Sequence, residues 1–268
     1  MRFRFFVGAA LVAALLGTAG ASANAAAHHD SGYTCTGGKW TGDPSTSTFS
    51  NIPSGTYSSI RVDGVCNVAL HAVITVTGNV EVAPGAVLDA QSAPSTITIG
   101  GNVSAGEHSL LGLGCQANTA HAPHPCAIES HGASTITVGG NVTATDAFLV
   151  LLNGITVGKN VTLTGGGGGD WAEKNNTVGG DFTISHVTPD WLGLEFNTIG
   201  HDANLHKIWA VDPADKGNGA VSVVVNIVGH DLSCTDLGPR LSGGIFRGEV
   251  NVVGHESTGQ CKGLVGGS

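Results

Sequence analysis

The 268-residue chain contains little charge, and positive charge is the scarcer kind. Charged residues make up 12 % of it, with 11 Lys and Arg against 20 Asp and Glu. So few basic residues supply little positive charge to attract phosphate groups. We therefore expect neither a nucleic acid partner nor binding to anionic membranes. Although the chain contains 42 glycines, its apolar content of 41 % and regularly spaced Val and Ile predict a folded core rather than disorder.

Familiar motifs for catalysis and for zinc are also missing. No cysteine pair has C-x-x-C spacing, and no Ser or Cys nucleophile motif stands out. Weak catalytic candidates are Asp181, Asp202 and Asp231, as an acid and base or as a calcium cluster, with Lys207 or Arg240 as the cation of a lyase. We therefore favour a protein without catalysis and keep an enzyme as an alternative.

Residues 1–25 have the layout of a secretory signal peptide. Arg2 and Arg4 precede an apolar stretch at 5–16, and small residues follow it. The apolar stretch is short for a bilayer span, and no Cys directly follows it as a lipid attachment site. We expect a secreted, extracellular protein without a membrane anchor, whose remaining 9 basic and 20 acidic residues give a net charge of about −11.

Six cysteines in an exported chain predict a disulfide framework. Sequence proximity favours three structural pairs, which are Cys35–Cys66, Cys115–Cys126 and Cys234–Cys261.

A repeat organises the chain. Its unit is apolar-Thr-apolar-Gly, then a small residue or His, then Asn or Asp, and eight copies begin at Ile74, Ile97, Ile136, Ile155, Asn176, Asn197, Asn226 and Asn251. The intervals between the glycine positions are 23, 39, 19, 21, 21, 29 and 25 residues, and we interpret the 39 as two rungs, one distorted by the Cys115–Cys126 loop. The period-two alternation around each glycine predicts strands.

These features predict an all-β, right-handed parallel β-solenoid of about eight or nine rungs. The residue before each glycine should point inward, as should the row from Val80 to Ser257 three positions after it. In the last four copies the first position is Asn, which predicts a buried asparagine ladder. Residues 26–59 lack the repeat and are expected to form a flexible segment and a cap, with the solenoid domain spanning 60–268.

The run from Ile74 to Val80 and its later copies resemble the rungs of bactofilins over roughly residues 74–259. That resemblance implies filament assembly without enzymatic activity. The chain also resembles, more loosely, the pectate-lyase-like β-helix proteins, which often carry asparagine ladders. Their catalytic motifs are missing from the sequence, which contains no adjacent Asp pair, no Gly-His-Gly and no Arg-Ile-Lys.

Two sets of histidines are candidate metal ligands. The first occupies equivalent positions of three rungs and comprises His201, Asp202, His230, Asp231, His255 and Glu256, with Asp181 extending the row. These residues could bind a divalent metal, or they could be corner residues that bond the backbone. The second set surrounds the Cys115–Cys126 pair and comprises His108, His121, His124 and His131. No other cofactor is expected.

Aromatic and hydroxyl side chains suggest two further surfaces. Trp171, Trp191 and Trp209 lie on adjacent rungs, where they could form a strip that stacks against sugars or could cover the core. A predicted outward row of threonines resembles an ice-binding face, although Thr is also a common outward strand residue. That row comprises Thr75, Thr98, Thr137, Thr156, Thr177 and Thr198, and a second patch comprises Thr143, Thr145, Thr162, Thr164, Thr183 and Ser185.

The favoured hypothesis is a non-catalytic extracellular solenoid with a structural, adhesive or glycan-binding role, whose partner is an extracellular or cell-surface polysaccharide. The alternatives are a polysaccharide-active lyase or hydrolase that uses the acidic row, and a metal- or ice-binding surface. A monomer and an end-to-end oligomer are both compatible with the sequence.

Overall fold

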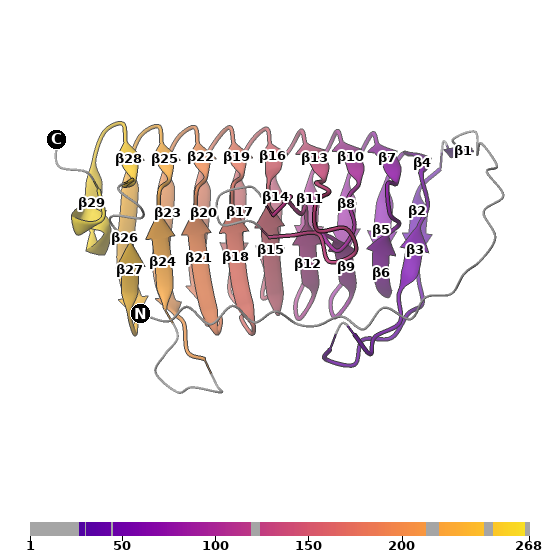
Figure 1. The fold of residues 1–268 in the computed structure, drawn as a ribbon, viewed down its shortest axis with the longest axis horizontal. Helices are drawn as coiled ribbons and strands as arrows, with labels where there is room; N and C mark the ends of the chain where they lie inside the picture. Colours follow the sequence, from indigo (N-terminus) through magenta and orange to yellow (C-terminus); the bar gives the residue numbers. More distant parts are fainter. Residues whose placement is uncertain are drawn as a thin grey trace.

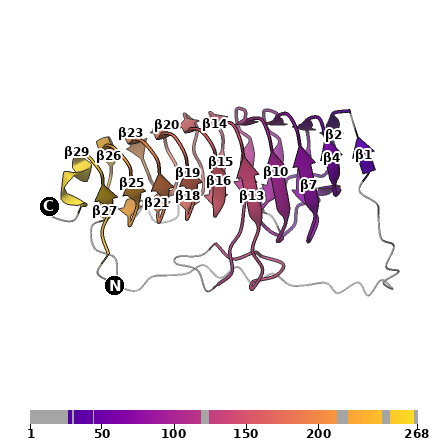
Figure 2. The ribbon, with the colours of Figure 1, turned by 90° about the horizontal axis from the view of Figure 1, so that it is seen from above.

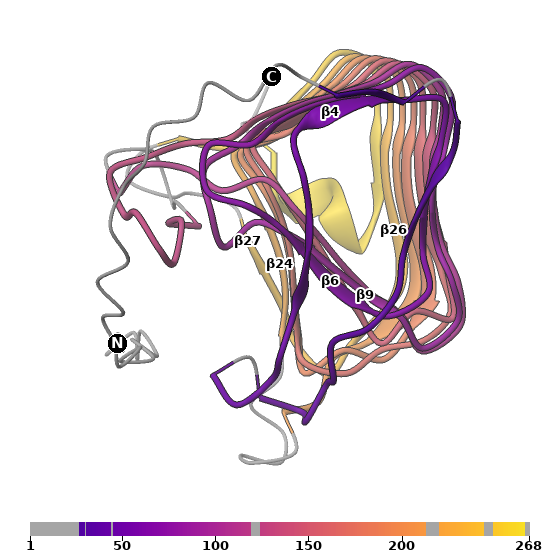
Figure 3. The same cartoon turned by 90° about the vertical axis from the view of Figure 1, so that its right-hand side faces the viewer.

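A computed structural model describes residues 27–29, 31–43, 45–118, 124–212, 220–243 and 249–265. The strands form three parallel sheets in which each strand pairs with the equivalent strands of the rungs before and after it. Seen along its axis, the molecule has three sides, and the strands of successive rungs lie behind one another (Figure 3). This confirms the predicted all-β parallel solenoid.

Sheet 1 contains the apolar-Thr-apolar part of the repeat. Its ten strands are β1 (Ala27–His29), β4 (Gly55–Tyr57), β7 (Val73–Val76), β10 (Thr96–Ile99), β13 (Thr135–Val138), β16 (Ile155–Val157), β19 (Thr177–Val178), β22 (Thr198–Ile199), β25 (Ile227–Val228) and β28 (Val252–Val253). Copies of the repeat are in register, since Ile97 pairs with Ile74 on one side and with Ile136 on the other.

Sheet 2 follows the glycine corner. Its ten strands are β2 (Tyr33–Cys35), β5 (Ile60–Val62), β8 (Val80–Val82), β11 (Val103–Ala105), β14 (Val142–Thr145), β17 (Val161–Thr164), β20 (Phe182–Val187), β23 (Ala203–Trp209), β26 (Leu232–Gly238) and β29 (Ser257–Gly259). The row three positions after the glycine is buried from Val80 to Leu232 and half-buried at Ser257, as predicted.

Sheet 3 closes each rung. Its nine strands are β3 (Ser50–Ile52), β6 (Val65–Val68), β9 (Val87–Ala90), β12 (Leu110–Leu113), β15 (Leu149–Asn153), β18 (Asp170–Lys174), β21 (Trp191–Glu195), β24 (Val221–Val224) and β27 (Leu241–Gly243). A short 3₁₀-helix, η1 (Gln260–Gly263), follows β29 at the C-terminal end.

The solenoid differs from the prediction at two places. Residues 26–59 were predicted as a flexible segment and cap, yet this stretch contains β1 to β4, which pair with β4 to β7, so two sheets have ten strands. The 39-residue interval is one rung rather than two, because β10 pairs directly with β13. The extra residues form a long connection between β12 and β13 that leaves the body of the solenoid (Figure 2).

The predicted asparagine ladder is present inside the solenoid. Asn176, Asn197, Asn226 and Asn251 are all buried. The Nδ2 of each of the first three donates to the Oδ1 of the next at 3.0, 3.0 and 3.1 Å. Every ladder amide also donates to a sheet 3 carbonyl, such as that of Leu152 for Asn176 at 2.8 Å. The ladder therefore uses both hydrogens of each amide, as a buried polar group requires.

All three predicted disulfides are present, namely Cys35–Cys66, Cys115–Cys126 and Cys234–Cys261. Three disulfides indicate folding in an oxidising environment. Among the residues described, no helix is both long enough and apolar enough to cross a membrane. The predicted signal peptide, 1–25, lies outside the described residues.

Candidate functional site

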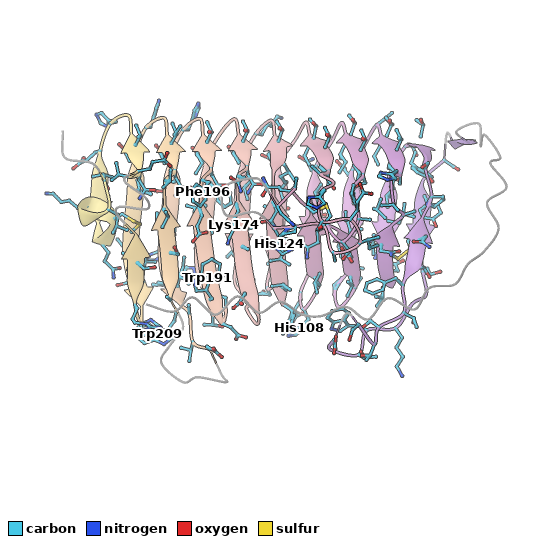
Figure 4. All side chains as sticks on the ribbon, in the orientation of Figure 1. His108, His124, Lys174, Trp191, Phe196 and Trp209 are labelled. Carbon is cyan, nitrogen blue, oxygen red and sulfur yellow. A yellow bond between two sulfur atoms is a disulfide. The ribbon has the colours of Figure 1, made fainter. Side chains whose placement is uncertain are left out.

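The three tryptophans do not form the predicted strip. Trp171 is fully buried in the core, where its Nε1 donates to the carbonyl oxygens of Phe148 and Gly168 at 3.1 and 3.2 Å. Trp191 is half-buried on the outer face of sheet 3, whereas Trp209 is 55 % exposed at the end of β23 in sheet 2. The two lie on different sheets, and Figure 4 shows Trp191 over sheet 3 and Trp209 at the edge of the solenoid.

The His and acid residues lie along the corner between sheets 1 and 2. There the side-chain Oδ1 of an Asn or Asp in one rung accepts a hydrogen bond from the backbone N–H of the equivalent residue in the next rung, at 2.8–3.2 Å. The residues in this file are Asn79, Asn102, Asn141, Asn160, Asp181, Asp202, Asp231 and Glu256. We call this the exterior Asx file. The carboxylates of Asp181, Asp202 and Asp231 accept backbone hydrogen bonds at this corner, which is the alternative considered from the sequence.

The imidazoles of the same corner stack along the axis rather than surrounding a common point. The rings of His201 and His230 are nearly parallel, 5.3 Å apart. The Nδ1 of His255 lies 2.8 Å from the Oδ1 of Asp231, and this hydrogen bond raises the pKa of His255 and lowers that of Asp231.

The proposed metal sites do not assemble within the described part of the chain. Among those residues, no three His, Cys, Asp or Glu side chains are grouped so that they could hold a metal ion. In the second histidine set, His108 lies beside Glu107 at the edge of the solenoid (Figure 4), and His124 belongs to the long connection. His121 lies outside the described residues.

The Thr rows have the predicted register. On sheet 1, Thr75, Thr98, Thr137, Thr156, Thr177 and Thr198 are aligned, and Ile227 and Val252 continue the row. All of these except Thr75 are exposed. On sheet 2, Thr143 aligns with Thr162 and Thr183, and Thr145 aligns with Thr164 and Ser185.

A cluster that the sequence interpretation missed lies on the outer face of sheet 3. The Lys174 Nζ is 3.2 Å from the Glu195 Oε2, and the Ser222 hydroxyl donates to the other Glu195 oxygen at 2.7 Å. The same Nζ lies 5.0 Å from the centre of the Trp191 ring, within cation–π range (Figure 4). We call these four residues, Lys174, Trp191, Glu195 and Ser222, the sheet 3 cluster.

The strands explain how this cluster forms. Lys174 pairs with Glu195 across β18 and β21, and Gly193 pairs with Ser222 across β21 and β24, so these outward side chains are neighbours. Gly193 has no side chain, and the far edge of the Trp191 ring lies over it, where a Cβ atom would clash. Small residues on the outer face therefore make room for the indole.

Two segments pack on other parts of this face, and one of them borders the cluster. Near the N-terminal end, Trp40 and Phe49 pack on a second apolar group, formed by Val65, Val87 and Leu110. Next to the cluster lies the connection that contains the Cys115–Cys126 disulfide, in which Gln116 accepts a hydrogen bond from the Asn175 amide at 2.9 Å. Burial lowers the pKa of His124 in this connection, and the positive charge of Lys174 lowers it further. The negative charge of Asp89 raises it.

Acidic residues border the other side of Trp191. Asp170 pairs with Trp191 across β18 and β21. Burial raises the pKa of Asp170, and the carboxylates of Asp190 and Asp212 raise it further, while Lys174 lowers it. The pKa of Asp190 is likewise raised by burial and then by Asp212. Negative charge therefore lies next to the indole.

A regular position in the repeat carries part of this cluster. Lys174 and Glu195 each stand two residues before a ladder asparagine, Asn176 and Asn197. The position two residues before each repeat therefore predicts that Lys174 and Glu195 point outward from neighbouring rungs.

Comparisons of the chain with protein-family models, with curated proteins and with solved structures found no match.

Proposed function

We propose that the protein is an exported, non-catalytic solenoid that binds a glycan on the outer face of sheet 3. The observation that carries this proposal is the half-buried indole of Trp191 beside a paired lysine and glutamate and a serine hydroxyl. An aromatic face supplies apolar contact with a sugar ring, and a few fixed polar groups orient its hydroxyls.

Export is part of the proposal. It rests on the signal-peptide layout of residues 1–25 and fits the oxidising environment that the disulfides indicate. The bactofilin-like rungs supply a rigid rod that presents the site at the cell surface or in the extracellular medium.

Binding is favoured over turnover because of how the carboxylates are used. The Oδ1 atoms of Asp181, Asp202 and Asp231 accept backbone N–H groups in the exterior Asx file, and the Glu195 carboxylate is held by Lys174 and Ser222. A general acid or base instead needs a pKa matched to proton transfer at the reacting bond.

The test is glycan binding by two tryptophan variants. The purified protein is incubated with insoluble and soluble polysaccharides, and binding is measured by pull-down and by calorimetry. Trp191→Ala should abolish binding, whereas Trp209→Ala, which removes a more exposed indole from another sheet, should not. Both variants should keep the β-rich circular dichroism spectrum. If both bind as the wild type does, or if the wild type binds no glycan, the proposal fails.

The threonine row of sheet 1 favours a second candidate function, ice binding. From Thr75 to Val252 this row presents β-branched residues in register, one per rung, about 4.8 Å apart. Regularly spaced methyl and hydroxyl groups could order water in a repeating pattern. Ice growth should be inhibited by the wild type and by Thr162→Lys on sheet 2, but not by Thr137→Lys on sheet 1. Absence of inhibition by the wild type would exclude this function.

A further inference from the structure

Asn153, at the end of β15, is fully buried and has no hydrogen-bond partner. Neither its Oδ1 nor its Nδ2 is paired, although both are shielded from solvent. The buried ladder asparagines, by contrast, use both hydrogens of their amides. A buried, unpaired amide costs about 1–3 kcal/mol for each unmet group, so the position of Asn153 calls for an explanation.

The position places this amide in the sheet 3 cluster. Asn153 pairs with Lys174 across β15 and β18, and Lys174 pairs with Glu195 across β18 and β21. The three side chains therefore form one outward file over three consecutive rungs. The first has unused hydrogen-bonding capacity, while the other two are bonded to each other.

A second unpaired polar side chain lies on the neighbouring strand. Glu173 is buried inside the solenoid next to Lys174, and both of its carboxylate oxygens lack a partner. Asn153 and Glu173 are the two described residues with two such orphaned atoms each, and Glu173 pairs with Leu152. Unmet polar groups that reduce stability tend to be kept where a protein has a function.

We infer that Asn153 is a specificity-determining residue of the glycan site and that the glycan is neutral. This inference rests on the proposed function. The Asn153 amide offers one acceptor and two hydrogens, which match the hydroxyl groups of an uncharged sugar. Lys174 is neutralised by Glu195, and Asp170 stands beside Trp191, so the described residues of the site offer no free cation for an acidic sugar.

Gln116 lies next to the residue that follows this amide. Its side chain lies against Gly154, the residue after Asn153, and its Oε1 holds the amide of Asn175. Binding of a sugar hydroxyl by Asn153 requires the side chains that cover this fully buried amide to move aside.

Replacing Asn153 with an apolar residue of similar size separates ligand binding from stability. The proteins compared are the wild type, Asn153→Leu, Trp191→Ala and, as a matched control, Asn67→Leu on the outer face of β6, where the Oδ1 is also unpaired. Soluble laminarin, galactomannan and xylan are the neutral probes, polygalacturonate is the acidic probe, and calorimetry measures binding. Asn153→Ala replaces Asn153→Leu if the larger side chain prevents folding.

Asn153→Leu is expected to weaken binding of a neutral polysaccharide by about tenfold or more while raising Tm, because a lost hydrogen bond to the ligand removes affinity and an apolar side chain removes two unpaired atoms. Asn67→Leu should bind as the wild type does. Wild-type affinity in Asn153→Leu, with binding lost in Trp191→Ala, would overturn the role of Asn153 alone. Binding of polygalacturonate only would overturn neutrality, and no binding by the wild type would overturn the proposed function and this inference together.

Discussion

The two halves of the solenoid turn from sheet 3 to sheet 1 in different ways. In the first half, connections of several residues follow β6, β9 and β12. In four rungs of the second half, one residue with positive φ makes the turn: Gly154, Asn175, Phe196 and Val225, with φ of 72°, 57°, 57° and 53°. The residues that follow these four are Ile155 and then three of the ladder asparagines, Asn176, Asn197 and Asn226.

This difference explains where the asparagine ladder begins. A residue that carries a side chain loses free energy when its backbone adopts the left-handed conformation. A one-residue corner of this kind therefore needs a compensating interaction. At Gly154 the turn has little cost, and the next residue is Ile155, whose N–H already bonds to the Asn176 Oδ1 at 3.1 Å. At Asn175, Phe196 and Val225 the corner residue carries a side chain, and each is followed by an asparagine that bonds the carbonyl of the preceding rung. The first three ladder asparagines therefore each follow a tight corner, whereas Asn251 follows the longer connection from β27 to β28.

The largest effect is expected from a substitution within the ladder. Asn197→Asp replaces the Nδ2, which donates to the Glu173 carbonyl and the Asn226 Oδ1, with an oxygen in a buried site. We expect a loss of about 3–5 kcal/mol in the free energy of unfolding, measured by chemical denaturation. Asn160→Asp in the exterior Asx file is the control and should stay within about 0.5 kcal/mol, because the exposed Asn160 side chain bonds in that file through its Oδ1 acceptor, which a carboxylate keeps. Equal losses would contradict this account.

The next effect concerns the disulfide at the ladder's C-terminal end. The Asn251 Nδ2 donates to the Leu264 carbonyl at 2.8 Å, and Cys234–Cys261 ties this segment to β26. Removing that disulfide with two Cys→Ala substitutions should cost about 2–4 kcal/mol. Removing Cys115–Cys126, which has a sequence separation of 11 rather than 27, should cost less because it closes a shorter loop. Thermal denaturation without reductant measures both, and the reverse order would argue against the stabilising role of the terminal link.

The buried carboxyl group of Glu173 makes the stability of the second half of the solenoid depend on pH. Burial raises its pKa well above the usual 4.5, and the nearby Leu152 N–H opposes this only partly. The folded state therefore binds the proton more tightly than the unfolded state does, and stability falls as pH rises above about 4.5 towards the folded pKa. Glu173→Gln should match the wild type near pH 4 and exceed it at higher pH, by at most about 1.4 kcal/mol per pH unit. Denaturation at pH 4, 6 and 8 measures this, and a constant difference would rule it out.

The smallest effect tests the corners directly. Val225 has a φ of 53°, which costs a β-branched residue about 1–2 kcal/mol. Val225→Gly removes that strain but adds the flexibility of glycine to the unfolded chain, so we expect a net gain of about 0.5 kcal/mol. Gly154→Val should have the opposite sign and a loss of about 1–2 kcal/mol. A loss of stability in Val225→Gly would show that packing of the valine outweighs the strain.

The candidate site was harder to predict than the fold, for a reason that Trp171 and Trp191 illustrate. Both follow an aspartate, but they lie 13 and 12 residues after the glycines of their rungs, Gly158 and Gly179. Side chains alternate across a strand, so a shift of one residue reverses the face. Asp170 accordingly pairs with Trp191, and Trp171 points into the core. The two tryptophans look equivalent in the sequence and are opposite in space.

By itself, the sequence determined the parallel rungs, the two inward rows and the asparagine ladder, because each depends on a spacing repeated along the chain. It determined the disulfide pairs through the proximity of their cysteines. The tertiary structure alone decided that residues 26–59 join the sheets and that the 39-residue interval is one rung. It also decided that Lys174, Trp191, Glu195 and Ser222 meet on sheet 3. These features depend on register and on how a long connection packs, and contacts between residues distant in the chain set both.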